Sequence, residues 1–309
     1  MARIVITDCD FGSGDIEAEI LGDTVDLAVF QAKTADDVIA AGQGARGLFV
    51  QWARIDATIL DALPDLRAIV RYGIGLDNID LDAARERGIA VSNVDDYCID
   101  EVATHAASAI VAASRRLWEY DRAVRAGGWA PSLAPAPLPP EKDPVGIVGL
   151  GRIGREVAER VRAWGHPVYY WDPVLPADAG MDGAERIDTL VELAETVTHL
   201  TLHVPLLDQT RGLIDATVLA ALGGEGHLVN VSRGPLVDEP ALLAALDSGA
   251  IARASLDVLV EEPPAVGSIS RRIAEHERVL VTPHMAYLST KALLTLREHA
   301  ATRMLELIR

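Results

Sequence analysis

The stretch VGIVGLGRIGREVAERVRAW, residues 145–164, limits the possible folds more than any other part of this chain. An apolar run leads into Gly149, Gly151 and Gly154, and an amphipathic helical pattern begins at the same point. The first glycine permits a tight turn, the second lets a pyrophosphate approach the backbone, and the third lets helix and strand pack closely. Free N–H groups at the helix N-terminus favour an anion. The order of elements predicts a βαβ unit that binds a dinucleotide.

The next apolar run, PVYYWD at 167–172, ends in an acidic residue. Asp172 can accept hydrogen bonds from both hydroxyls of an adenosine ribose, and its charge would repel a 2′-phosphate. Pro173 follows it, where an arginine would favour the phosphorylated cofactor. We therefore expect NAD(H) as the cofactor, in preference to NADP(H).

Short β-branched runs alternate with amphipathic helical patterns along the whole chain. The expected strands are residues 3–9, 25–30, 47–51, 66–72, 89–94, 145–150, 167–172, 199–204, 227–232, 253–258 and 278–283. Nearly continuous apolar strands between amphipathic helices indicate parallel sheets covered on both faces. The predicted fold class is α/β, with two doubly wound domains.

Three segments connect or complete these domains. PSLAPAPLPP at 131–140 is too rich in proline for a helix or a central strand, so it is expected to be an extended surface segment. The helical pattern over 100–126 is expected to be one long helix that joins the domains. A final amphipathic helix should begin at Ser289, whose hydroxyl suits an N-cap.

Length and composition exclude several classes of protein. The chain has 309 residues, which favours two domains because single cores stop growing near about 250–300 residues. No signal-peptide pattern is found, and no apolar run approaches the roughly 18 residues that cross a bilayer, so we expect a cytoplasmic protein without a membrane partner. The net charge of −18 argues against nucleic-acid binding. Cys9 and Cys98 lack metal-type spacing, so no metal is expected.

Three charged side chains follow three successive strands after the glycine motif. Arg233 lies in NVSRGPLVDEPAL, Glu262 in SLDVLVEEPP, and His284 at the end of VLVTPH. Ligands bind outside the carboxyl ends of parallel strands, where these residues should gather. A cation that holds a carboxylate and a carbonyl, an acid, and a carboxylate supporting that acid are the groups that reduction of a 2-keto acid needs. Each also has an ordinary explanation: a surface ion pair, a solvated loop charge, or a histidine held by a carbonyl.

Several ordered motifs resemble one enzyme family. They are VRYGIGLDNIDLDAARERGIAVSNV, DEVATHA, VGIVGLGRIG, LHVPLLDQTRGLI, NVSRGPLVDE, LDVLVEEPP and TPH, and they run from about residue 45 to the end. In this order they are similar to the D-isomer-specific 2-hydroxyacid dehydrogenases. The resemblance implies an NAD-dependent oxidoreductase that interconverts a 2-keto acid and a D-2-hydroxy acid.

The resemblance also implies roles for individual residues. Arg233 would bind the substrate carboxylate and carbonyl, Glu262 would hydrogen-bond His284, and His284 would donate the proton. The backbone amides expected to seat the carboxylate are those of Tyr72, Gly73, Ile74 and Gly75. The residues expected around the cofactor are Gly149, Gly151, Arg152, Ile153, Gly154, Asp172, Val204, Pro205, Thr210, Val231, Ser232, Arg233, Asp257 and His284, with Asp257 near the carboxamide.

The domain plan follows from the same resemblance. A Rossmann NAD-binding domain, residues 99–285, would be inserted into a flavodoxin-like substrate domain formed by 1–98 and 286–309. Members of the family usually form homodimers through the cofactor domain, and the helix after Asp100 is the expected contributor.

Two questions stay open at this point. HMAYLS, with Tyr287 three residues after His284, also resembles the C-terminal-binding proteins, which are transcriptional corepressors on the same scaffold; an NAD(H)-dependent binding protein with incidental turnover is therefore the alternative. Tyr287, Trp52 and Arg54 are candidates for the wall of the substrate pocket, and Arg54 for contact with a second anionic group. Core packing explains Tyr287 equally well.

Overall fold

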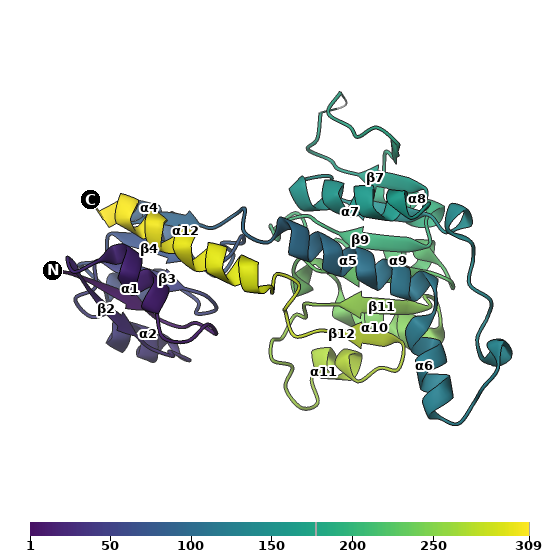
Figure 1. The fold of residues 1–309 in the computed structure, drawn as a ribbon, viewed down its shortest axis with the longest axis horizontal. Helices are drawn as coiled ribbons and strands as arrows, with labels where there is room; N and C mark the ends of the chain where they lie inside the picture. The colour runs from purple at the N-terminus through teal and green to yellow at the C-terminus, as the bar shows by residue number, and fades with distance from the viewer. Residues whose placement is uncertain (177, 309) are drawn as a thin grey trace. The chain divides into compact units, whose positions relative to one another are not determined.

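The computed structural model describes residues 1–176 and 178–308. The chain divides into two compact units, each a parallel sheet with helices on both faces (Figure 1). Unit 1 comprises Met1–Cys98 and Leu288–Arg309, of which Arg309 lies outside the described residues. Unit 2 comprises Ile99–Tyr287. This pair of doubly wound α/β units confirms the predicted fold class.

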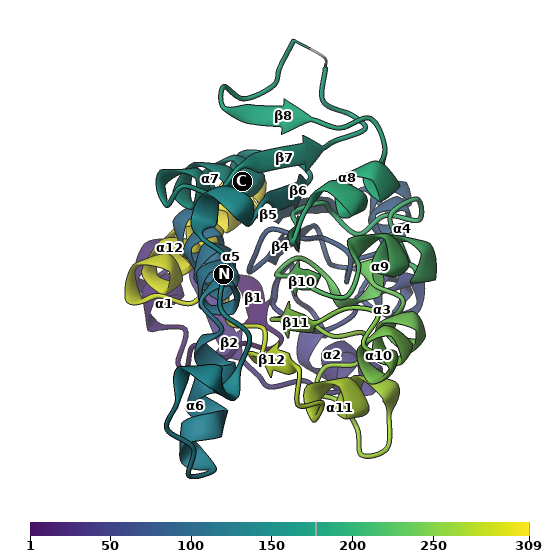
Figure 2. The ribbon, with the colours of Figure 1, turned by 90° about the vertical axis from the view of Figure 1, so that its right-hand side faces the viewer.

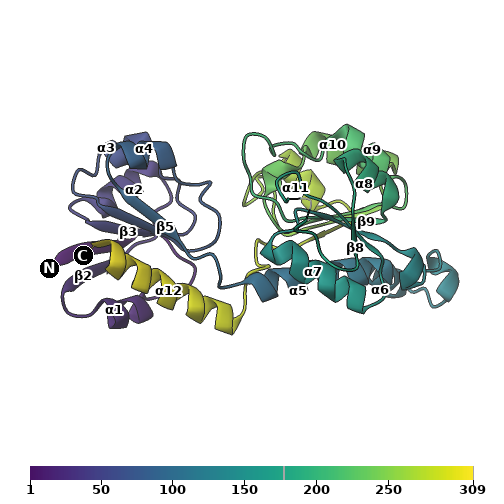
Figure 3. The same ribbon diagram turned by 90° about the horizontal axis from the view of Figure 1, so that it is seen from above.

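Unit 1 has a five-stranded sheet with the order β2-β1-β3-β4-β5, which is the flavodoxin-like order. Its elements are β1 (Ala2–Ile6), α1 (Asp15–Leu21), β2 (Val25–Val29), α2 (Ala35–Gly42), β3 (Gly47–Val50), α3 (Ala57–Asp61), β4 (Ala68–Arg71), α4 (Leu81–Glu86), β5 (Ala90–Asn93) and α12 (Thr290–Ile308). Helices α1 and α12 cover one face of the sheet, and α2, α3 and α4 cover the other (Figure 3).

Unit 2 has a seven-stranded sheet with the order β12-β11-β10-β9-β6-β7-β8. Its elements are α5 (Ile99–Ser114), α6 (Leu117–Arg125), η1 (Pro131–Leu133), η2 (Pro140–Lys142), β6 (Val145–Val148), α7 (Arg152–Ala163), β7 (Val168–Trp171), β8 (Ala184–Arg186), α8 (Leu190–Thr196), β9 (His199–Leu202), α9 (Ala216–Leu222), β10 (His227–Asn230), η3 (Gly234–Leu236), α10 (Glu239–Ser248), β11 (Arg253–Leu256), α11 (Ile269–Ala274) and β12 (Val279–Val281). Helices α5 and α7 lie on one face, and α8 to α11 lie on the other (Figure 2).

Two features of unit 2 differ from the sequence-based expectation. The single helix expected over 100–126 is wrong, because the chain breaks between α5 and α6, where Arg116 has a φ of 54°. The Arg116 guanidinium binds Glu119 and Glu225 at this corner. Strand β8 was not expected, because its three residues carry two charges and pair only with the edge of β7. Periodicity finds long apolar elements and misses short polar ones.

A row of buried polar side chains crosses the amino edge of the unit 2 sheet. The Nε2 atom of His199 lies 3.0 Å from an Asp143 carboxylate oxygen, and its Nδ1 atom lies 2.9 Å from Nδ1 of His227. The second ring nitrogen of His227 lies 2.9 Å from the Ser255 hydroxyl. Burial lowers the pKa of both histidines, which favours neutral rings that pass one hydrogen bond to the next. The row lies at the opposite end of the strands from Arg233 and His284 and serves the fold.

The returning helix α12 is fixed to unit 1 by one buried ion-pair network. The predicted N-cap is confirmed, since the amide of Ala292 donates to the Ser289 hydroxyl at 2.9 Å. Further along, Arg297 donates to both carboxylate oxygens of Glu17, and Glu17 is only 1% exposed. The Tyr72 hydroxyl donates to the same carboxylate at 2.9 Å. The C-terminal helix, α1 and the end of β4 therefore meet at one buried charge.

Replacing Arg297 by methionine should lower the free energy of unfolding of unit 1 by about 3–5 kcal/mol, because the Glu17 carboxylate would stay buried without its cation. Urea denaturation, with hydrogen exchange of α12 as the local probe, measures this change. Arg303→Met is the matched control on the same helix: its partner Asp95 is partly exposed, so the loss should stay below about 1 kcal/mol. Equal losses in the two variants would contradict the assignment.

Candidate active site

The glycine motif forms an open cradle at the start of α7. Gly149 has a φ of 93°, and a Cβ there would lie 2.7 Å from a methyl carbon of Val204. A Cβ on Gly154 would lie 2.1 Å from the Gly149 carbonyl oxygen, so only glycine lets the helix sit this close. A Cβ on Gly151, by contrast, would meet nothing within 4 Å. The space beside Gly151 and the N-terminus of α7 fits a pyrophosphate.

Around this cradle the structure places the other residues expected at the cofactor. Arg152 and Ile153 open α7, and Val204 and Pro205 follow β9. The Thr210 hydroxyl donates to the Pro205 carbonyl at 2.7 Å and accepts the Leu207 amide at 2.8 Å, so it closes its own loop. These residues therefore shape the carboxyl edge of the β6–β9 pair.

Asp172 lies at the end of β7 with 8% of its surface exposed. One carboxylate oxygen accepts the amides of Val174 and Leu175, each at 3.0 Å, and the other accepts the amide of Leu150 at 2.9 Å. A carboxylate oxygen has two acceptor positions. Among the described residues, one position is thus left on the oxygen that faces the glycine loop. That position suits a ribose hydroxyl.

The loop after β10 carries Arg233 and is shaped by a buried asparagine. The Asn230 side chain accepts the Ser232 amide at 3.0 Å and donates to the Arg233 carbonyl at 2.8 Å. The Ser232 hydroxyl reaches back to the Leu202 carbonyl at 2.7 Å. The half-buried residues Val231 and Ser232 therefore lie in a rigid turn, and the Arg233 guanidinium donates to the Ser232 carbonyl at 2.7 Å.

His284 and Glu262 are in direct contact, as predicted from the sequence. The Nδ1 atom of His284 lies 2.7 Å from a Glu262 carboxylate oxygen, and the other carboxylate oxygen accepts the Leu259 amide at 2.7 Å. A carboxylate only accepts, so Nδ1 carries the hydrogen in this contact. Of the two ring nitrogens, Nε2 is therefore the one that does not face Glu262, and an imidazole can transfer a proton there.

His284 itself has a left-handed backbone, with a φ of 51°. Asp257, only 3% exposed at the end of β11, holds this turn. Its carboxylate accepts the Met285 amide at 2.9 Å, the Ala286 amide at 2.8 Å and the Thr282 hydroxyl at 2.5 Å. The role expected for Asp257, contact with a carboxamide, needs the one acceptor position that these bonds leave among the described residues. Its larger structural task is to position His284.

The loops that carry Arg233 and Glu262 also touch each other. A Cβ on Gly234 would lie 2.0 Å from the Leu259 carbonyl carbon, so only glycine permits this backbone contact. Strands β10, β11 and β12 are neighbours in the sheet. The predicted set of Arg233, Glu262 and His284 thus lies at one edge of unit 2.

In unit 1, two of the four backbone amides expected to bind the substrate carboxylate are already hydrogen-bonded within the fold. The Tyr72 amide donates to the Val50 carbonyl at 2.8 Å, and the Gly73 amide to the Arg71 carbonyl at 3.0 Å. The predicted contact with the substrate carboxylate therefore depends on the amides of Ile74 and Gly75. The Tyr72 side chain is buried and stacks on Phe49. Burial raises the pKa of this phenol well above its usual value, in keeping with a structural role.

Sequence reasoning missed Arg71 at the same loop. Its guanidinium nitrogen lies 1.7 Å from where a Cβ of Gly73 would stand, so the glycine at this point, with a φ of 138°, makes room for the arginine. The Arg71 guanidinium lies against Gly73 and so adds positive charge to the segment that follows it. The signal was present in the sequence as the arginine that precedes Tyr72.

The three candidates for a pocket wall have different surroundings. The Trp52 indole donates to the Asp10 carboxylate at 2.7 Å, and its backbone amide donates to Asp8 at 2.6 Å. Arg54 is exposed just beyond this turn. Tyr287 is half-buried at the end of unit 2. Trp52 and Arg54 both follow β3, while Tyr287 belongs to the other unit.

The described residues hold neither a metal site nor a membrane-spanning helix. Within 1–176 and 178–308, no group of three or more His, Cys, Asp or Glu side chains could hold a metal ion. Cys9 and Cys98 are buried, and neither forms a disulfide within the described part of the chain. None of the helices in the described part of the chain is long and apolar enough to cross a membrane.

The chain is similar in sequence to the members of one enzyme family. Residues 107–286 match the family described as D-isomer specific 2-hydroxyacid dehydrogenase, NAD binding domain. Glyoxylate/hydroxypyruvate reductase A of Arabidopsis thaliana is 37% identical over 233 residues, which are 75% of this chain and 72% of that protein. D-3-phosphoglycerate dehydrogenase of Mycobacterium tuberculosis is 37% identical over 94% of this chain, but the match spans only 53% of that longer protein.

A solved structure agrees over the whole fold. NADPH-dependent glyoxylate/hydroxypyruvate reductase from Sinorhizobium meliloti, in complex with NADP and malonate, superposes with a TM-score of 0.83 and 31% identity. The similarity covers 98% of this chain and 92% of that one. Both units therefore have counterparts in a protein that binds a nicotinamide dinucleotide and a small dicarboxylate.

Proposed function

Because the chain belongs to the D-isomer-specific 2-hydroxyacid dehydrogenase family, we propose that it is an NAD-dependent oxidoreductase that interconverts a 2-keto acid and a D-2-hydroxy acid. The observation that carries the proposal is the 2.7 Å contact between His284 and Glu262 at the sheet edge that also holds Arg233 and the glycine cradle. An acid supported by a carboxylate, next to a cation and a dinucleotide site, suits reduction of a carbonyl.

Each residue of this set has its own role in the proposed reduction of the carbonyl. The bound dinucleotide supplies or accepts the hydride. The Arg233 guanidinium binds the substrate carboxylate and polarises the carbonyl, because its planar donors match two oxygens at once. As the carbonyl carbon gains the hydride, Nε2 of His284 gives its proton to the carbonyl oxygen. Glu262 keeps Nδ1 hydrogen-bonded and compensates the positive charge of the ring before the transfer.

The remaining site assignments are part of the same proposal. Residues 99–285 form the dinucleotide-binding domain, and residues 1–98 with 286–309 form the substrate domain. The amides of Ile74 and Gly75, with Arg71 beside them, contribute to binding the substrate carboxylate. Asp172 favours NADH over NADPH, since its buried carboxylate binds the glycine loop, where the ribose would lie, and would repel a 2′-phosphate.

A panel of 2-keto acids, reduced with NADH and with NADPH in parallel, tests the activity. Wild-type protein should turn over at least one keto acid with NADH, and His284→Gln should lower kcat by about 10²–10⁴ because the proton donor is lost. His299→Gln is the matched control, because this partly exposed histidine on α12 pairs only with Asp96 among the described residues. Wild-type turnover in His284→Gln would refute the mechanism, and tight NADH binding without turnover of any keto acid would refute the activity.

We further propose that Arg54, with Trp52 and Tyr287, selects the substrate side chain. Arg54 is exposed beside a Trp52 ring that Asp10 holds in place, and an exposed guanidinium suits a second anionic group. Arg54→Ala should therefore raise KM about tenfold or more for dicarboxylic or phosphorylated keto acids and leave KM for uncharged side chains unchanged. An equal loss for all substrates in the panel would contradict this role.

The protein is also proposed to act in the cytoplasm as a homodimer joined through unit 2. Helix α6 and the segment after it expose large apolar side chains: Leu117, Val124 and Trp129 are 56%, 43% and 88% exposed. Figure 2 shows α6 extending past the edge of the unit 2 sheet. Exposed apolar surface of this kind marks an interface, and a second copy of the same surface would cover it.

Light scattering during size exclusion tests the dimer. Wild-type protein should elute as a dimer, and Val124→Asp combined with Trp129→Asp should shift it to the monomer, because two charges would be buried at the interface. Val266→Asp serves as the control, since Val266 is 99% exposed outside this segment. A wild-type monomer, or a dimer that survives both substitutions, would rule out this interface.

A further inference from the structure

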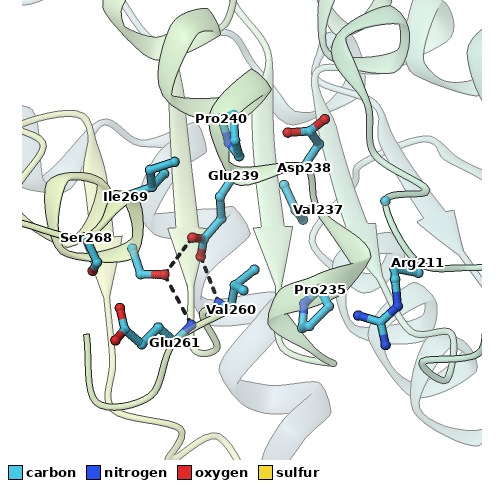
Figure 4. Close-up of a pocket in the computed structure, with 12 residues that line it drawn as sticks. Arg211, Pro235, Val237, Asp238, Glu239, Pro240, Val260, Glu261, Ser268 and Ile269 are labelled. Carbon is cyan, nitrogen blue, oxygen red and sulfur yellow. Dashed lines mark hydrogen bonds between the residues drawn. The ribbon is translucent and has the colours of Figure 1, made fainter. Parts of the chain in front are cut away.

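The loop that carries Glu262 is hydrogen-bonded to two buried side chains that have no role in the proposed mechanism. Glu239, the first residue of α10, is 6% exposed, and Ser270 in α11 is 2% exposed. One Glu239 carboxylate oxygen accepts the Val260 amide at 2.8 Å, and the other accepts the Ser270 hydroxyl at 2.6 Å. The Ser270 oxygen in turn accepts the Glu261 amide at 3.2 Å (Figure 4).

The direction of these bonds is fixed by chemistry. A serine hydroxyl has one proton, and here it goes to the Glu239 carboxylate, so the Ser270 oxygen can only accept from Glu261. Glu239 and Ser270 therefore act as one unit that binds two successive amides. Leu259, the residue before them, donates its amide to Glu262 itself at 2.7 Å. Three consecutive amides thus have side-chain acceptors.

Val258 and Leu259 begin this loop as buried residues, with Leu259 in the core, but the side chains after them are mostly exposed. The chain between β11 and α11 has no regular secondary structure over residues 257–268, and the Val260 side chain is 52% exposed. Helix α10, in contrast, is anchored in the core through Leu242 and Leu246. Through its hydrogen bonds to the Val260 and Glu261 amides, the Glu239–Ser270 unit holds the loop against this anchored helix. Glu262 is the next residue along the chain, and its other carboxylate oxygen contacts His284.

We propose that Glu239 and Ser270 are positioning residues that aim Glu262 at His284. This inference rests on the proposed function, because it concerns the proton donor of that reaction. An acid–base pair works only when held within about 0.5 Å of its productive geometry, and a misplacement of 1 Å costs about 10²-fold. The unit acts on catalysis through Glu262 and touches neither substrate nor cofactor.

The surroundings of the unit make the inference testable without unfolding the protein. Glu239, Ser270, Val260 and Glu261 line a cavity of about 460 Å³ that is open to solvent (Figure 4). When the Ser270 hydroxyl is removed, water can enter from the cavity and solvate the Glu261 amide. The loop is then no longer held in one position, but the Glu261 amide keeps a hydrogen-bond partner.

The experiment compares Ser270→Ala with Ser270→Thr and Ser268→Ala. Ser270→Ala should lower kcat about tenfold and leave the Kd for NADH unchanged. It should also move the alkaline limb of the kcat profile to lower pH, because the His284 imidazolium loses part of its support from Glu262. Ser270→Thr keeps a hydroxyl, and its added methyl can enter the cavity, so this variant should restore both kcat and the pH profile.

Ser268→Ala is the matched control on the same helix and cavity. Its hydroxyl caps α11 by accepting the Arg271 amide at 3.1 Å, so the substitution should lower Tm without changing the pH profile. A wild-type kcat and pH profile in Ser270→Ala, or the same shift in Ser268→Ala, would overturn the inference. His284→Gln separates the two levels: if that variant keeps full turnover, the proposed function fails, and if it is inactive while Ser270→Ala is normal, only the positioning role fails.

Discussion

The buried carboxylate of Asp257 is the interaction on which the candidate active site most depends. It binds two backbone amides and a hydroxyl in the turn after β12, and so holds His284 at a positive φ. That backbone costs a residue with a Cβ roughly 1–2 kcal/mol, which the surrounding hydrogen bonds must offset. The imidazole is therefore aimed by a group beneath it, and Glu262 completes the geometry from the neighbouring strand.

The same device recurs at other strand ends. Asp8 after β1 accepts the amides of Trp52 and Ala53, and Asp172 after β7 accepts the amide of Leu150 in the glycine loop. In each case an acid at the end of one strand binds the loop of the adjacent strand. Backbone amides in a loop need acceptors, and a buried carboxylate needs donors, so each satisfies the other. Part of the chain's acidity thus serves to build loops.

Sequence periodicity was sufficient for the long apolar strands and their covering helices, because burial on both faces leaves a continuous apolar run. It was insufficient at Arg116 and at β8. The turn at Arg116 depends on ion pairs with Glu119 and with the distant Glu225, and β8 forms only because β7 offers it an edge. The hydrogen bonds made by the amides of Tyr72 and Gly73 were equally hidden, since residue type does not reveal which amides the fold already uses.

By itself the sequence determined the fold class, the glycine cradle, and the residue types at three strand ends, because spacing and chemistry are local properties of the chain. The tertiary structure alone decided which ring nitrogen of His284 meets Glu262, that Asp257 holds the turn after β12, and that Glu239 and Ser270 hold the Glu262 loop between them. Those contacts join residues on different strands and helices. Their distances depend on how β10, β11 and β12 lie side by side, which no local pattern encodes.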